Sequence, residues 1–205
     1  MRKLSWFLAG ALSLLVAQTL IAVIVLTRAR GLSAREAPTS VERWSARRAR
    51  SAALPDGAKS RANPIRKTPD VLADARAHWA DHCASCHAND GSGENTMGKH
   101  MYPPAPDMRK SGTQGLSDGE LFYIIQNGIR ITGMPGWGSG SSHDEEDSWK
   151  LVHFIRHLPD LTVEERKQME KLNPKSPDEW KEEQEEENFL KGEGTNEPQQ
   201  QHHHH

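Results

Sequence analysis

The chain has 205 residues, of which 35% are hydrophobic, and a formal net charge of −2. Ordinary globular chains contain about 45–50% apolar residues, so a large core built from side chains alone is excluded. The near-neutral charge argues against a nucleic-acid partner, and two cysteines, Cys83 and Cys86, are too few for a disulfide framework. We therefore expect something other than side-chain burial to complete the fold.

Charges are separated along the chain. Residues 27–67 carry eleven Lys/Arg and three Asp/Glu, whereas residues 160–197 carry six and thirteen. This segregation predicts five segments. They are a membrane anchor at 1–27, a basic linker at 28–67, a compact domain at 68–159, an acidic helical extension at 160–191 and a disordered tail at 192–205. The tail ends in four histidines, which are either natural or a purification tag.

The first segment contains a long apolar stretch. Leu4 to Leu26 holds no charged residue, and as a helix it would span roughly 34 Å, enough for a hydrocarbon core of about 30 Å. A cleaved signal peptide is the alternative, but its apolar region is usually about 7–15 residues and is followed by a small-residue cleavage site. Thr27 to Arg30 supplies no such site, so we predict an uncleaved transmembrane helix.

The charges on the two sides of this helix predict its orientation. Seven arginines lie between residues 28 and 50, against two basic residues before the span, and the positive-inside rule would place the arginine-rich side in the cytoplasm. We expect most of the linker to be a solvated tether. A short basic helix at 43–50 that lies on anionic headgroups is the alternative.

The most specific signal is the motif Cys83-Ala84-Ser85-Cys86-His87. Two thiols at this spacing can both add to the vinyl groups of one haem, and the adjacent His87 can then ligate the iron. A zinc site would need four ligands and would have to use His82, His87 and His100. A thioredoxin-like pair would need a βαβ context, and a Cys83–Cys86 disulfide would close a very small loop. The motif favours a covalently attached haem c.

Around this motif, residues 70–158 resemble a monohaem class I c-type cytochrome. The resemblance implies a mostly α fold in which three to four core helices surround one covalent haem. It rests on six features in the family's order: a helix at 69–83 that leads into the motif, a Gly-rich turn at 89–93, a Pro-stiffened segment at 102–108, a helix at 118–127, the Gly-Met-Pro loop at 133–135 and a last helix at 143–158.

The resemblance also implies roles for single residues. The carbonyl of Pro106 would accept a hydrogen bond from Nδ1 of His87, which orients a ligating imidazole, and Met108 would point into the haem pocket. Met134 would be the distal iron ligand, since the family keeps a methionine in this loop. A thioether opposite an imidazole favours Fe(II) and raises the reduction potential.

Other distal ligands stay open. His100 or His143 would give two histidine ligands, and the sixth position of the iron could also be left open. The remaining methionines are less well placed in the sequence: Met97 and Met101 on the proximal side, Met108 after the proximal proline, and Met169 beyond the core.

Three further side chains are candidates for hydrogen bonds to the haem propionates, because each combines a donor with a stem that can line a pocket: Tyr102, Arg109 and Trp137. His153 and His157 are four residues apart on one helix face. They could bind a metal, but solvent exposure is the better interpretation.

Capping residues predict where the helices begin. Thr68 precedes Pro69 in the first helix, and capping boxes are expected at Ser117/Glu120, Ser142/Glu145, Thr162/Glu165 and Ser176/Glu179. We expect the helices to contribute Leu121, Phe122, Ile124, Ile125, Trp149, Val152, Phe154, Ile155 and Leu158 to the core. Trp180, Phe189 and Leu190 of the extension are expected to dock back on it.

These observations predict a membrane-anchored electron carrier. It would hold one haem c on the periplasmic side of the inner membrane and pass single electrons between redox proteins of a respiratory chain, without being an enzyme itself. The alternatives are a cytochrome subunit of a larger respiratory oxidoreductase, and a haem sensor or peroxidase with an open sixth iron position.

Overall fold

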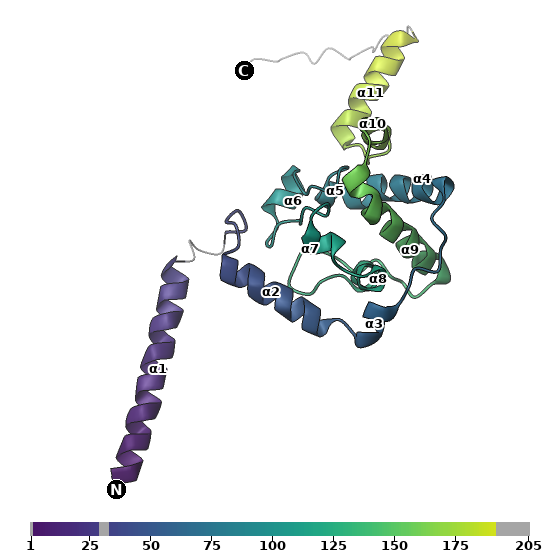
Figure 1. Ribbon diagram of the computed structural model, residues 1–205. Coiled ribbons are helices and arrows are strands. Elements are labelled where there is room, and N and C mark those ends of the chain that lie inside the picture. Colours follow the sequence, from purple (N-terminus) through teal and green to yellow (C-terminus); the bar gives the residue numbers. More distant parts are fainter. Residues whose placement is uncertain (1, 29–32, 192–205) are drawn as a thin grey trace, which may run out of the picture.

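The computed structural model describes residues 2–28 and 33–191, and within these ranges the chain is helical with no strand (Figure 1). The mostly α fold is therefore confirmed. The first helix, α1, runs over Arg2–Arg28, and its segment Lys3–Ile24 is long and apolar enough to cross a membrane. The large apolar side chains described between Leu4 and Ile24, and that of Leu26, are exposed. The expected tail at 192–205 lies outside the described residues.

The segment expected to be a solvated tether is largely helical. Helix α2 covers Ser40–Ala53 and α3 covers Asp56–Ser60. The α2 helix begins with a capping box between Thr39 and Glu42, which is the arrangement that satisfies free N–H groups at a helix start. Four arginines of this segment therefore lie on a helix rather than on extended chain: Arg43, Arg47, Arg48 and Arg50.

Residues 54–65 of the same segment pack against the compact domain. Leu54 and Ala58 are buried, and the Arg61 guanidinium lies 4.4 Å from the centroid of the Phe122 ring. The side-chain amide of Asn63 donates to the carbonyl of Trp149 at 2.9 Å. The Phe122 and Trp149 rings stack at 4.1 Å, and Arg61 covers this pair. This part of the linker therefore differs from a free tether.

The helix expected at 69–83 is present but changes its winding. Helix α4 covers Pro69–His78 and begins at Thr68, whose side chain accepts from the Val71 N–H as predicted. A π-helical turn follows at Trp79–Cys83, and α5 covers Ala84–His87. A π turn widens a helix locally. The residues that follow it, including most of the cysteine motif, are therefore rotated about the helix axis relative to a continuous α-helix.

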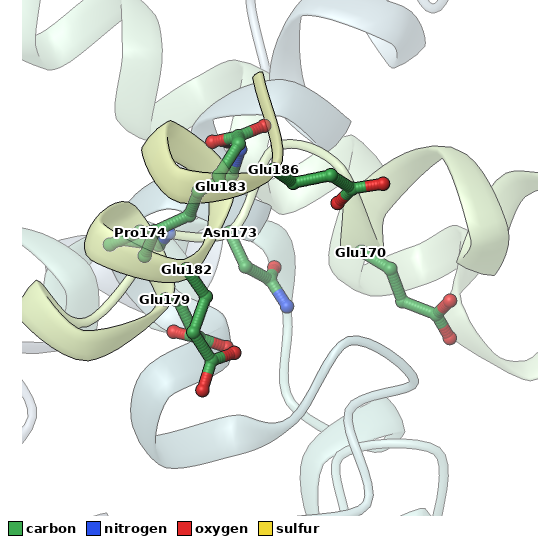
Figure 2. Close-up of a pocket in the computed structure, with 8 residues that line it drawn as sticks. Glu170, Asn173, Pro174, Glu179, Glu182, Glu183 and Glu186 are labelled. Carbon is green, nitrogen blue, oxygen red and sulfur yellow. Dashed lines mark hydrogen bonds and ion pairs between the residues drawn. The ribbon is translucent and has the colours of Figure 1, made fainter. Parts of the chain in front are cut away.

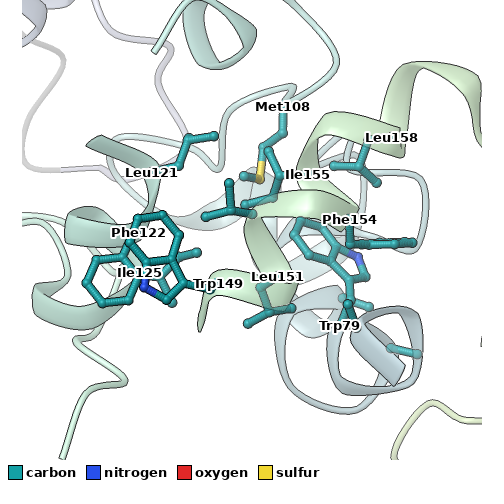
Figure 3. Close-up of a cluster of buried hydrophobic side chains, with 14 of the residues drawn as sticks. Trp79, Met108, Leu121, Phe122, Ile125, Trp149, Leu151, Phe154, Ile155 and Leu158 are labelled. Carbon is teal, nitrogen blue, oxygen red and sulfur yellow. The ribbon is translucent and has the colours of Figure 1, made fainter. Parts of the chain in front are cut away.

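Helix α9 (Ser142–His157) packs across α4 and forms the core with α8 (Asp118–Asn127), whose capping box at Ser117 and Glu120 is confirmed. The shorter helices α6 and α7 cover Thr96–His100 and Ser111–Gln114. Figure 3 shows large side chains that meet between α8, α9 and the turn at Trp79 that follows α4. All expected core residues are buried except Ile124, which is half-buried.

The cap of α9 was expected one residue too late. Ser141, not Ser142, accepts the hydrogen bond from the Asp144 N–H, and the Asp144 carboxylate turns back to accept from the Ser139 N–H at 3.1 Å. The Ser139 hydroxyl also donates to the Asp144 carboxylate. These bonds fix the start of α9 one residue earlier.

The acidic extension forms α10 (Val163–Glu170) and α11 (Pro177–Leu190), and both expected capping boxes are present. The expected docking of its large apolar side chains is wrong, since Trp180, Phe189 and Leu190 are 53%, 82% and 76% exposed. Met169 is fully buried in the main core instead. From its position in the sequence, Met169 was expected to lie beyond the core. Helix α10 instead packs so that this side chain lies inside the core.

Glutamates line a cavity of about 470 Å³ where α11 follows α10 (Figure 2). Its lining also includes Asn173, Pro174 and Lys175. None of these residues belongs to the predicted haem site, so the cavity is a feature of the extension alone.

His153 and His157 do not form a metal pair. Nε2 of His153 lies 2.7 Å from the carbonyl of Ile65, and Nε2 of His157 lies 3.0 Å from Oε1 of Glu165. Both side chains are half-buried, so the expected solvent exposure is also wrong. Each histidine instead joins α9 to a neighbouring segment.

Gly119 offers a test of the contact between α3 and α8. A Cβ at this position would lie 2.0 Å from the carbonyl oxygen of Ala58. We expect Gly119→Ala to lower the free energy of unfolding by about 1–3 kcal/mol because the added methyl overpacks the contact. Gly112→Ala is the matched control, since its Cβ meets nothing within 4 Å. Equal stability of the two variants in chemical unfolding would contradict the contact.

Candidate haem site

Trp79 fixes the end of the helix that carries the cysteine motif. It is 2% exposed, and its indole N–H donates to the carbonyl of Ala88 at 3.1 Å. Its ring lies 5.8 Å from the His87 ring and 5.4 Å from the Phe154 ring, measured between centroids. Ala88 itself has a φ of 60°, which is uncommon for a residue other than glycine. The indole bond therefore holds the chain where it reverses after His87.

Asn95 closes the loop that follows the motif. Its side-chain amide donates to the carbonyls of Ala84 and Ser85 at 2.8 and 3.0 Å. Its oxygen accepts from the Gly98 N–H at 2.7 Å. Sequence reasoning missed Asn95, although an asparagine before a short helix is a common N-cap and was available as a signal. The residue ties the two residues between the cysteines to the start of α6.

His87 is a half-buried imidazole whose Nδ1 has no hydrogen-bond partner. Burial lowers the pKa of His87 to about 4, so the ring is neutral at pH 7, which is the state that binds iron or another metal. Its Nδ1 is buried without a hydrogen-bond partner. This is the nitrogen expected to orient the ring through a hydrogen bond, so iron would bind the other ring nitrogen, Nε2.

The hydrogen bond expected from His87 to the Pro106 carbonyl is not formed in this structure. The segment around Pro106 is held by its backbone instead. The N–H of Ala105 donates to the Gly98 carbonyl at 2.9 Å, and the N–H of Met108 donates to the Gly91 carbonyl at 2.8 Å. These bonds fix the path of the Pro-rich segment without using the imidazole.

The two cysteines are free thiols. Burial raises the pKa of the Cys83 thiol to about 12, with a further contribution from Cys86. The Cys86 sulfur lies 3.4 Å from the sulfur of Met97. The disulfide alternative is not formed, and no group of three or more His, Cys, Asp or Glu within residues 2–28 and 33–191 is placed to bind zinc. The motif residues fit haem attachment better than either alternative.

Met134 lies half-buried in a loop that is fastened to the end of α8. Its carbonyl accepts from the Ile129 N–H at 3.1 Å, and its own N–H donates to the Thr132 hydroxyl at 3.1 Å. Gly128 has a φ of +67°, and a Cβ there would come within 2.6 Å of the Met134 carbonyl. Glycine is therefore required where α8 ends, and Thr132 is a further positioning residue that sequence reasoning missed.

The loop of Met134 meets the segment that follows the cysteine motif. A Cβ added at Gly133 would clash with the sulfur of Met101. The chain thus brings Met101 next to the Gly-Met-Pro loop, while Met97 contacts Cys86. Two methionines four residues apart therefore contact the motif and the Gly-Met-Pro loop, one each.

The other expected ligands differ in their surroundings. Met108 is 9% exposed and belongs to the hydrophobic core. Met97 is 56% exposed. The His143 side chain is 79% exposed and lies 3.4 Å from an Asp147 oxygen, at the start of α9. Met169 is enclosed by core side chains.

Two of the three expected propionate partners are engaged elsewhere. The Tyr102 hydroxyl donates to Oε1 of Glu42 at 2.9 Å, and the Arg109 guanidinium donates to both Asp107 and Asp90 at 2.8 Å. Trp137 is 41% exposed and meets the His82 ring edge-on at 5.6 Å. Carboxylates of the protein therefore engage the donors of Tyr102 and Arg109.

Helices α4, α8 and α9 around a Cys-x-x-Cys-His motif, with a methionine loop between α8 and α9, define a class I c-type cytochrome domain. Residues 70–155 match the family model described as "Cytochrome C oxidase, cbb3-type, subunit III". The matched segment is less than half of the chain, and the match supports a haem-containing electron-transfer cytochrome domain there. No curated protein matches the chain.

Asp107 predicts a pH dependence of stability. Its hydrogen bond to Arg109 holds the pKa of the Asp107 carboxyl well below its usual range. A depressed pKa stabilises the fold above the unfolded-state value, about 4, and this stabilisation is lost as the pH falls below it. We expect Asp107→Asn to lower the free energy of unfolding at pH 7 by about 1–3 kcal/mol and to reduce the loss of stability in acid.

Exposed Asp160 provides the control for this experiment. Asp160→Asn should leave both the stability at pH 7 and its acid dependence close to those of the unchanged chain. Urea unfolding of the full chain at a series of pH values measures both quantities. An Asp107→Asn curve that follows the Asp160→Asn curve would contradict the assigned role of the Asp107–Arg109 contact.

Proposed function

We propose that the chain is a membrane-anchored electron carrier with one haem c, attached to Cys83 and Cys86 and ligated by His87 and Met134. The observation that carries this proposal is the half-buried, neutral His87 directly after two free cysteines. When bound, the haem supplies a one-electron Fe(III)/Fe(II) couple. No substrate chemistry is assigned to the chain itself.

Each motif residue has a distinct task in this proposal. The thiols of Cys83 and Cys86 hold the haem covalently, which replaces apolar bulk that the side chains lack. His87 supplies a neutral imidazole, and Met134 supplies a thioether that favours the reduced iron. Trp79 and Asn95 do not touch the metal in this scheme. They fix the backbone on either side of the motif.

We propose that α1 anchors the chain in the inner membrane with the cytochrome domain on the periplasmic side. The length and apolar character of Lys3–Ile24 support the anchor. The periplasmic side is supported by the motif, because c-type cytochromes of this kind receive their haem there. The arginine-rich segment after the span argues for the opposite orientation under the positive-inside rule, so the topology needs a direct test.

A second candidate is a cytochrome subunit of a larger respiratory oxidoreductase. The matched family is described by a subunit of a cbb3-type oxidase, and α11 exposes Trp180 and Phe189, as a helix does when it packs against a partner. A free carrier and a subunit differ in their behaviour in mild detergent, where only a subunit co-purifies with a larger complex in fixed ratio.

Met134→Ala tests the distal ligand in protein matured with a haem-attachment system. We expect the variant to keep its covalent haem in denaturing mass spectrometry but to lose the near-infrared charge-transfer band of methionine-ligated Fe(III). The reduced variant should also bind carbon monoxide, because the sixth position opens. Met97→Ala and Met101→Ala are the controls and should keep the band. An unchanged spectrum for Met134→Ala would exclude it as ligand.

A reporter fused after residue 60 tests the topology. We expect a periplasm-dependent reporter such as alkaline phosphatase to be active and a cytoplasm-dependent one to be inactive. The same reporters fused before α1 give the opposite pattern and serve as the control. Cytoplasmic location of residue 60 would contradict the proposed site of haem attachment.

A further inference from the structure

Helix α2 contacts the cytochrome domain near its two ends. Glu42 accepts from the Tyr102 hydroxyl, and near the other end Arg50 is partly buried and Leu54 is buried. Burial lowers the pKa of Arg50, while the Glu120 charge opposes this change. Residues 42 and 50 share one face at 3.6 residues per turn, so this face points to the domain.

The opposite face of α2 is open and amphipathic. Val41 and Trp44 are 73% and 58% exposed, and they lie on the side away from Glu42 and Arg50 by helical spacing. The Arg48 guanidinium lies 5.9 Å from the centroid of the Trp44 ring, and exposed Arg47 lies at the edge of this face, three residues before Arg50. Tryptophan beside arginines on an exposed helix is the composition of helices that lie in the membrane interface.

The chain keeps this face close to the proposed membrane. Eleven residues separate the end of α1 at Arg28 from the start of α2 at Ser40. Even a fully extended segment of this length reaches only about 40 Å. The open face of α2 therefore stays close to the headgroups of the leaflet where α1 ends. Its arginines have the charge that anionic lipids attract.

We propose that Val41, Trp44, Arg47 and Arg48 form a docking surface for an anionic lipid bilayer, a role that rests on the proposed membrane anchor. The aromatic and aliphatic side chains would enter the interface while the guanidinium groups bind lipid phosphates. Because Tyr102–Glu42 and residues 54–65 couple α2 to the domain, the docked helix fixes how the cytochrome domain faces the membrane.

The test uses the full haem-loaded chain in nanodiscs of phosphatidylcholine, with or without phosphatidylglycerol. We expect backbone hydrogen exchange of residues 40–53 to be slower in the anionic discs, and this protection to be lost at high salt because salt screens the charges. Arg47→Gln combined with Arg48→Gln should lower the ratio of docked to undocked helix about 25-fold, at roughly fivefold per arginine.

A matched variant removes the same charge elsewhere. Lys167→Gln combined with Lys181→Gln neutralises two exposed lysines of α10 and α11 and should leave the protection of residues 40–53 unchanged. Equal exchange in both lipids by a chain that is present in the discs would overturn the docking surface and leave the anchor and haem proposals standing. A chain that does not enter the discs would overturn both the anchor and the docking surface.

Discussion

The packing of α4 across α9 is the contact on which the candidate site depends. Trp79 and Phe154 meet between these helices, and the Trp79 indole then reaches forward to the carbonyl of Ala88. One aromatic side chain therefore belongs both to the core and to the cysteine motif. The position of His87 is set by core packing rather than by the motif itself, which contributes only a short four-residue helix.

The segments outside the core attach to it through few but specific contacts. Arg61 covers the stacked Phe122–Trp149 pair, and the acidic extension is joined through buried Met169 and the contacts of Glu165 with Arg76 and His157. Such attachments add little apolar burial. They extend a small domain, whose own core is modest, with helices that remain largely available to other molecules.

Much of the helical framework could be predicted from local sequence signals. A threonine or serine followed three residues later by glutamate determines its own hydrogen bonds, so the caps at Ser117, Thr162 and Ser176 were found in advance. The start of α9 was missed because Ser139, Ser141 and Ser142 compete, and the choice depends on where the Asp144 carboxylate turns. Local patterns alone do not rank such alternatives.

Long-range contacts were the part that the sequence could not show. Asn95 donates to the carbonyls of Ala84 and Ser85, and Arg109 donates to Asp90. These bonds, like the burial of Met169, depend on how separate segments pack. The cysteine motif was recognisable because its chemistry is encoded within five adjacent residues. The surroundings of Met134 depend on where two loops meet, which needs the folded chain.

The docking of residues 54–65 has a practical consequence for the boundaries of the cytochrome domain. The family match begins at residue 70, yet a fragment cut there would lose Arg61 from the Phe122 ring and Asn63 from the Trp149 carbonyl. Nε2 of His153 would also lose the Ile65 carbonyl. The packed unit therefore extends at its amino end beyond the segment that sequence comparison matches, and it includes residues 54–65.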